Sequence, residues 1–181
     1  MTPRRAQKLI QALSSQRLAL EPLLGTHAEH LFLILADPRT HRWIHPPKHP
    51  TVADLRAHWT LGESRCEATG LEARLAWALR RLHDGVYIGK IDANVSDIKW
   101  ATNVGYILSP EVWGRGYATE AVGVVVEHLF SRGIRGCHAY VRPGNDASCR
   151  VLTRAAFEPA GMLLDELKFT RKAPNAGVSA R

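Results

Sequence analysis

Residues 103–121 read NVGYILSPEVWGRGYATEA, and this stretch of the 181-residue chain organises the interpretation of the rest. Its first part, residues 104–108, predicts a β-strand that Ser109-Pro110 ends. Its last part opens a helix over residues 116–132, with Gly133 placed as a C-cap. Apolar residues recur in it at helical spacing: Ala118, Ala121, Val122, Val125 and Leu129. A glycine-containing turn therefore joins a strand to a helix.

This turn has the local design of an anion-binding site. Its glycines let backbone amides approach a ligand closely, and the helix N-terminus adds about half a positive charge. Arg115 lies within the turn and can supply a full charge, so a pyrophosphate is a natural occupant. On these residues alone, a plain tight connection is an equal alternative. Neither the dinucleotide-binding fingerprint nor the P-loop pattern is present.

The rest of the sequence predicts one α+β domain with helices on a mixed sheet. Capping patterns at Thr26, Thr51 and Asn145 predict three further helices. Period-two alternation and the turn Asp84-Gly85 predict a hairpin. The expected strands are residues 17–21, 74–80, 86–95, 104–108, 134–141 and 163–170. We expect residues 1–16 to be a basic extension, 17–172 the domain, and 173–181 a flexible tail.

The composition is that of an ordinary soluble protein, and the expected location is the cytoplasm. No apolar run approaches the roughly 18 residues of a membrane span, and no secretory signal is recognisable. The net charge of +7 suits an anionic ligand. It comes without a dense basic run, so no specific nucleic-acid partner is expected. The three cysteines lack metal-ligand spacing, and we expect a monomer or homodimer.

Two separated motifs resemble one known family. Residues 103–121 are similar to the central motif of the GNAT acetyltransferases, closest to the branch of ribosomal-protein N-terminal (Rim-type) acetyltransferases. Residues 145–152, NDASCRVL, resemble the Asn-x-x-Ser-x-Arg-Val-Leu helix start of that branch. Residues 17–23 resemble its first strand. The resemblance covers residues 17–172, nearly the whole chain.

The resemblance implies a twisted, mostly antiparallel sheet with two splayed central strands. The strand ending at Leu108 would separate from residues 134–141, and the pantetheine arm of acetyl-CoA would enter between them. Backbone amides near Ile107 and Leu108 would face the thioester carbonyl. The remaining residues expected to contact the cofactor are Trp113, Gly114, Arg115, Gly116, Tyr117, Ala118, Thr119, Asn145 and Ser148.

The acid is assigned by the same resemblance, while the base stays open. Leu152 stands where many GNAT enzymes have a tyrosine, so Ser148 is the expected partner of the leaving thiolate. Its alternative role is a helix cap beside Asn145, which positions the cofactor or the helix. Asn103 stands where this branch often has a carboxylate. The general base is therefore Asp92, Glu111 or a chain of water molecules.

A metal site is not expected. His41, His45 and His49 lie four residues apart, but Pro46, Pro47 and Pro50 prevent a shared helical face. These histidines and Trp43 are expected to lie in a loop that borders the acceptor site.

Three classes of function follow. The leading one is direct acetyl transfer from acetyl-CoA to an amine, on a protein N-terminus, an amino acid, a polyamine or an antibiotic. The alternative is a non-catalytic acyl-CoA sensor, suggested by Asn103 in place of the carboxylate. An RNA- or ribosome-binding protein, suggested by the net charge, is the third.

Overall fold

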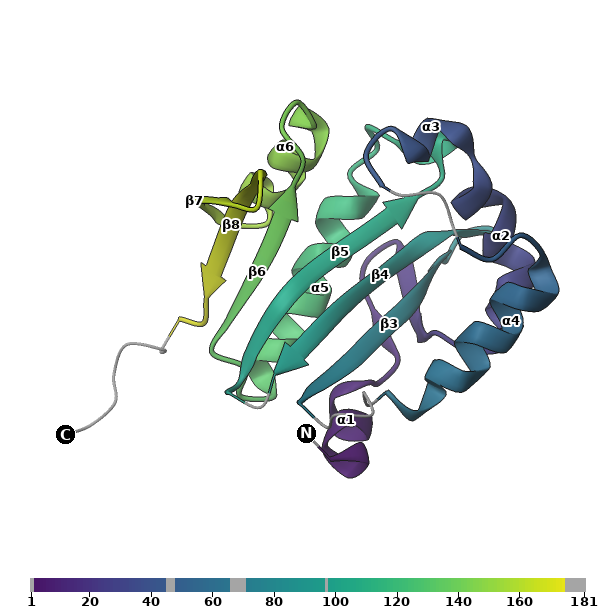
Figure 1. The fold of residues 1–181 in the computed structure, drawn as a ribbon, viewed down its shortest axis with the longest axis horizontal. Helices are drawn as coiled ribbons and strands as arrows, with labels where there is room; N and C mark the ends of the chain where they lie inside the picture. Colours follow the sequence, from purple (N-terminus) through teal and green to yellow (C-terminus); the bar gives the residue numbers. More distant parts are fainter. Residues whose placement is uncertain (1, 45–47, 66–70, 97, 175–181) are drawn as a thin grey trace.

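The computed structural model describes residues 2–44, 48–65, 71–96 and 98–174, and within them one sheet carries helices on both faces (Figure 1). The strands are β1 (Leu13–Ser14), β2 (Leu18–Pro22), β3 (Glu72–Arg81), β4 (Tyr87–Ser96), β5 (Trp100–Leu108), β6 (Gly136–Val141), β7 (Glu158–Leu163) and β8 (Glu166–Lys172). The helices are α1 (Pro3–Leu9), α2 (Ala28–Ala36), α3 (Pro38–His41), α4 (Val52–Leu61), α5 (Tyr117–Ser131) and α6 (Asp146–Arg154), with three short 3-10 turns.

The strand order is β1-β2-β3-β4-β5-β6-β8-β7. Every neighbouring pair is antiparallel except β5 and β6, which run parallel because α5 crosses over between them. The predicted α+β fold with a mixed, mostly antiparallel sheet is confirmed.

The parallel pair is joined only at its base. Its register contains Trp100↔Gly136 and Ala101↔Cys137, and no later pair among the described residues of these strands. Figure 1 shows β5 and β6 moving apart toward their C-terminal ends. The predicted splay is therefore present, and the C-terminal half of β5 is paired on its β4 side only.

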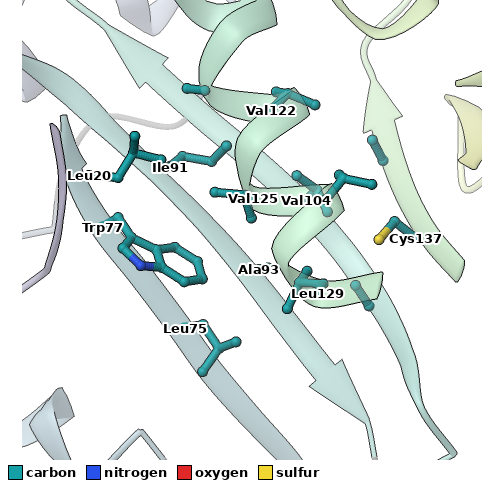
Figure 2. Close-up of a cluster of buried hydrophobic side chains, with 14 of the residues drawn as sticks. Leu20, Leu75, Trp77, Ile91, Ala93, Val104, Val122, Val125, Leu129 and Cys137 are labelled. Atoms are coloured by element: carbon teal, nitrogen blue, oxygen red, sulfur yellow. The ribbon is translucent and has the colours of Figure 1, made fainter. Parts of the chain in front are cut away.

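The main core lies between the sheet and the helices α1, α5 and α6. Figure 2 shows side chains of α5 meeting inward-facing side chains of the strands, with Trp77 fully buried among them. Smaller clusters under α2 and α4 cover the other face. Burial against a sheet on one side of each helix explains the apolar stripes in the sequence.

Several elements differ from the sequence-based expectation. The Thr51 cap is confirmed, since its hydroxyl accepts from the Asp54 amide at 3.1 Å. The Thr26 cap is wrong, because a 3-10 turn precedes α2 and the helix starts at Ala28 without a side-chain cap. The expected last strand, 163–170, is present as β8, but its predicted start is wrong. A turn at Leu164 and Asp165, both with positive φ, splits it between β7 and β8.

The N-terminal segment is ordered into α1 and β1. Ala6, Leu9 and Ile10 are buried in the main core, and the Trp77 indole donates to the Gln11 carbonyl at 2.8 Å. Among the residues that the structure describes, no helix is long and apolar enough to cross a membrane.

Candidate active site

The turn between β5 and α5 presents backbone donors to solvent. Gly114 and Gly116 have φ of 75° and 81°, in the left-handed region that side chains other than glycine rarely adopt. Gly116 is the N-cap of α5 and offers no side chain to cap the helix. The first amide that bonds within the helix is that of Glu120, to the Gly116 carbonyl at 3.1 Å. Four amides, from residues 116–119, are left to hold an anion.

A network from the N-terminal strand holds this turn in shape. The Glu120 carboxylate accepts hydrogen bonds from the Ser15 hydroxyl at 2.6 Å and the Arg17 amide at 2.9 Å. It also forms a salt bridge with the Arg17 guanidinium at 2.6 Å. The same guanidinium donates to the Arg115 carbonyl at 3.0 Å and lies 4.4 Å from the centre of the Tyr117 ring. Arg17 thus holds the turn in shape, with its charge paired to Glu120.

Glu120 stabilises the fold through its ionised form. Burial raises the pKa of this carboxyl, but the hydrogen bonds from Ser15 and Arg17 outweigh it and leave the pKa below its usual value. A lowered pKa contributes stability above the unfolded-state pKa, and the contribution is lost as pH falls through the folded-state pKa. We expect Glu120→Gln to lower the free energy of unfolding by about 2 kcal/mol at pH 7.

Denaturant unfolding of both proteins across pH measures this difference. It should begin to shrink as the pH falls below the ordinary glutamic acid pKa of about 4.3, and disappear only once the pH is below the lowered pKa of the folded wild type, where that carboxyl is protonated too. A difference that stays constant from pH 7 to pH 3 would contradict the assignment to the charge. Lowered affinity for coenzyme A in the same variant would show that the network also shapes the turn.

The alternation of the ladder selects which β5 amides face the splay. Ser109 N–H donates to the Ile88 carbonyl of the neighbouring β4 segment at 2.8 Å. Residues two apart face the same side in an antiparallel ladder, so the backbone groups of Ile107 also face β4. Those of Leu108 face the splay, where its carbonyl accepts from the Trp113 indole at 2.9 Å. Of the two predicted amide donors, Leu108 therefore has the required direction.

Ser148 lies at the other side of the splay with two partners. Its amide donates to the Asn145 side chain at 3.2 Å, so Asn145 caps α6. Its hydroxyl lies 2.7 Å from the hydroxyl of Tyr106 on β5. Burial raises the pKa of Tyr106 to about 12, which keeps the phenol protonated at neutral pH. Tyr106 is part of the quoted motif, but only the structure shows its contact with Ser148.

The base candidates lie in different surroundings. The Glu111 side chain is 74% exposed and pairs with Arg39 at 2.7 Å. Asp92 lies on β4 directly opposite Gly105 of β5, next to Lys90, whose ammonium contacts its carboxylate. Asn103 is exposed on β5 and opposite Asn94. Asp92 is thus the candidate whose carboxylate sits beside the splayed strand.

The thiols and the histidine loop have structural explanations. Burial raises the pKa of Cys149, and that of Cys137 to about 12, so both stay protonated at neutral pH. The prediction of a loop is wrong for His41, which is the last residue of α3 and contacts the Leu35 carbonyl. His49 stacks on His58 with ring centres 4.2 Å apart. His45 lies outside the described residues. Among those that are described, no cluster of three potential metal ligands occurs.

Comparison with known families agrees with this geometry. A family model described as the acetyltransferase (GNAT) domain matches residues 17–158. The chain therefore belongs to the GNAT acetyltransferase family, as the two motifs predicted.

Curated relatives carry the same class of activity in their names. The uncharacterised N-acetyltransferase YoaA of Bacillus subtilis (strain 168) is 32% identical over 91 residues, which are 49% of this chain and 51% of that protein. The uncharacterised N-acetyltransferase C18E5.08 of Schizosaccharomyces pombe is 34% identical over 76 residues, 41% of each chain. The chain spans about half or less of the length of these relatives.

Solved structures of ribosomal-protein acetyltransferases share the fold. The ribosomal-protein-S5-alanine acetyltransferase of Vibrio fischeri superposes with a TM-score of 0.76 at 17% identity, covering 93% of this chain and 100% of that one. RimJ of Mycobacterium smegmatis, in complex with CoA-disulfide, gives 0.74 at 22% identity, covering 91% and 87%. At such identities the likeness establishes the fold alone.

Proposed function

We propose that this protein is an acetyl-CoA-dependent N-acetyltransferase that transfers the acetyl group directly to a primary amine. The observation that carries the proposal is the hydroxyl pair Tyr106–Ser148, which spans from β5 to α6 beside the splay. The anion-binding turn at the start of α5 directly follows β5, the strand that carries Tyr106. A site for the pyrophosphate and a site for the acyl thioester are therefore neighbours in the chain.

Donor binding rests on backbone groups. The amides of residues 116–119 receive the pyrophosphate and Arg115 adds positive charge, while Arg17, paired with Glu120, holds the turn in shape. The splayed edge of β5 offers main-chain groups to the pantetheine amides in the manner of strand addition. The Leu108 amide is directed to stabilise the negative charge that develops on the thioester oxygen.

Tyr106 and Ser148 act on the leaving group. The phenol remains protonated and donates to the Ser148 oxygen, which turns the Ser148 hydroxyl proton outward, toward the coenzyme A sulfur. A thiol has a pKa of roughly 8.5, so the departing thiolate needs a hydrogen bond more than complete protonation. Two hydroxyl groups with much higher pKa values suit that task. The amine nitrogen forms the C–N bond by adding to the thioester carbonyl, which places negative charge on its oxygen. When the C=O bond re-forms, the C–S bond breaks and the sulfur retains the electron pair.

Asp92 is the proposed base. The acceptor amine must lose a proton before or during attack, and a carboxylate beside the reacting strand can receive it directly or through water. Both carboxylates are paired with a cation, Glu111 with Arg39 and Asp92 with Lys90, but the Glu111 side chain is 74% exposed and the Asp92 side chain 35%. Asn145 supports the reaction indirectly, by fixing the start of α6 and hence the position of Ser148.

Release of free thiol from acetyl-CoA tests the function, measured with and without a panel of amines. We expect amine-dependent release in the wild type. Ser148→Ala should lower kcat by about 10- to 100-fold while the Kd for coenzyme A changes little, since only the transition state gains negative charge on sulfur. Tyr106→Phe should produce a smaller loss, because Ser148 can still donate.

Cys149→Ser, one residue away on the same helix, is the matched control and should retain near wild-type kcat. A fully active Ser148→Ala variant would reduce Ser148 to a cap of α6. Tight binding of acetyl-CoA without transfer to any amine would instead favour the acyl-CoA sensor.

A further inference from the structure

A cavity of about 660 Å³ lies on the sheet face opposite α5, between the end of α4 and the strands β3 and β4. β4 contributes alternate residues to it, Lys90, Asp92 and Asn94, whose neighbours Ile91, Ala93 and Val95 are buried in the main core. This is the period of a strand that presents one apolar and one polar face. This polar face forms the floor of a partly open cavity, with Arg74 and His58 of its lining exposed to solvent.

The lining of the cavity carries more positive than negative charge. Among the described residues that line it, the cations are Arg65, Arg74 and Lys90, and the one carboxylate is Asp92, which contacts the Lys90 ammonium. His58 also lines it, but burial and the nearby His49 and Arg74 lower its pKa, so it adds little charge at neutral pH. Arg65 is only 6% exposed and donates to the Leu23 carbonyl. Its charge is therefore held in place within the wall.

The cavity borders the reacting strand at a position that lacks a side chain. Asp92 is paired with Gly105, and Lys90 with Ile107, so these pairs lie on the same sheet face. A Cβ atom placed on Gly105 would lie 3.2 Å from the Asp92 carboxylate. Glycine thus leaves the Asp92 oxygen next to the β5 backbone, immediately before the segment that carries Leu108.

We propose that this cavity binds the acceptor, and that it selects primary amines carrying an anionic group near the amine. The ammonium approaches Asp92 beside Gly105, while the anion is held by Arg74 and the buried Arg65; Lys90 is paired with Asp92. Amino acids and acidic peptide N-termini have this chemistry. Polyamines and aminoglycosides, which are polycations, are repelled by the excess of positive charge in the lining. The proposal rests on the N-acetyltransferase function and specifies its acceptor.

Matched acceptor pairs test the selection. Three pairs of acceptors differ in an anionic group: alanine and alaninamide, phosphoethanolamine and ethanolamine, and a peptide with acidic residues after its N-terminus and the same peptide with Gln in their place. Spermidine represents the polycations. We expect the anionic member of a pair to have at least about a tenfold higher kcat/KM, as one or more hydrogen bonds to a charged group would provide. Which pair shows the largest ratio identifies the anion as carboxylate or phosphate.

Arg74→Met should lower kcat/KM for the anionic member by about tenfold and change the neutral member by less than twofold. Lys8→Met removes one positive charge from the exposed surface of α1 and should leave every ratio unchanged. Thermal unfolding confirms that both variants are folded. Binding of the same pairs to the chain saturated with coenzyme A, by calorimetry, reads the preference without turnover.

The two proposals fail in different ways. Transfer to neutral amines at rates equal to those of their anionic partners would overturn the selection and leave the acetyltransferase function intact. Preferential binding of anionic amines without transfer to any of them would support the cavity and overturn the function. Equal binding and equal rates, or an unchanged ratio in Arg74→Met, would refute the assignment of the cationic wall.

Discussion

Gly116→Val is expected to weaken coenzyme A binding at least 100-fold, about 2.7 kcal/mol at 1.36 kcal/mol per tenfold. Gly116 has φ of 81°, a conformation that a β-branched residue adopts only with strain of about 1–3 kcal/mol. Its amide and the three that follow it are the donors at the N-terminus of α5. A side chain here both disturbs their direction and occupies the approach of the pyrophosphate.

Gly133→Val is the matched control, because Gly133 has the same φ of 81° and follows the opposite end of α5. Among the described residues beyond its two chain neighbours, none has a heavy atom within 4 Å of the position that a Cβ atom would take there. Both variants should lose similar stability in denaturant unfolding, but only Gly116→Val should lose affinity in calorimetry. Equal affinities of the two variants for coenzyme A would show that the turn before α5 does not bind the donor.

Asp92→Asn is expected to lower kcat/KM by about 100-fold at pH 7, the lower end of what a general base contributes. The amide keeps the shape of the side chain but cannot accept the proton. The loss should diminish as pH rises through the pKa of the acceptor ammonium, since more of the amine is then already neutral. A pH profile of kcat/KM for wild type and variant measures this convergence.

Glu111→Gln is the control for the second carboxylate, and it should change kcat/KM by less than twofold because Glu111 is exposed and paired with Arg39. A loss in Asp92→Asn that is the same at every pH would indicate a positioning role through Lys90. A large loss in Glu111→Gln with a small one in Asp92→Asn would reverse the assignment.

Local patterns in the sequence were sufficient for the meander, for α5 and for the Thr51 and Asn145 caps. Each of these features depends on residues that are close together in the sequence, such as Asn145 and Ser148. β7 was missed because all its side chains are exposed and it contains Pro159 and Gly161, so no alternation marks it. α1 was missed because seven residues with a basic surface gain their burial only from the rest of the core.

The candidate site divides in the same way. The backbone cradle was predictable, since glycines and a helix start are adjacent in the chain. The Ser15–Arg17–Glu120 network, the Tyr106–Ser148 contact and the cationic cavity join residues far apart in sequence, and a single sequence does not show which distant side chains meet. The assignments of Ser148, Asn145 and the donor-binding residues remain predictions for the experiments above.

The partial pairing of β5 and β6 has a consequence for the solubility of the free protein. After Ala101 in β5 and Cys137 in β6, the two strands face each other but their register contains no further pair. Strand edges of this kind are templates for the strands of other molecules, and proteins generally cover or charge them to prevent aggregation. A pantetheine arm lying between β5 and β6 would cover them from inside the sheet. Bound donor would thus prevent the pairing of these edges with strands of other molecules, in addition to supplying the acetyl group.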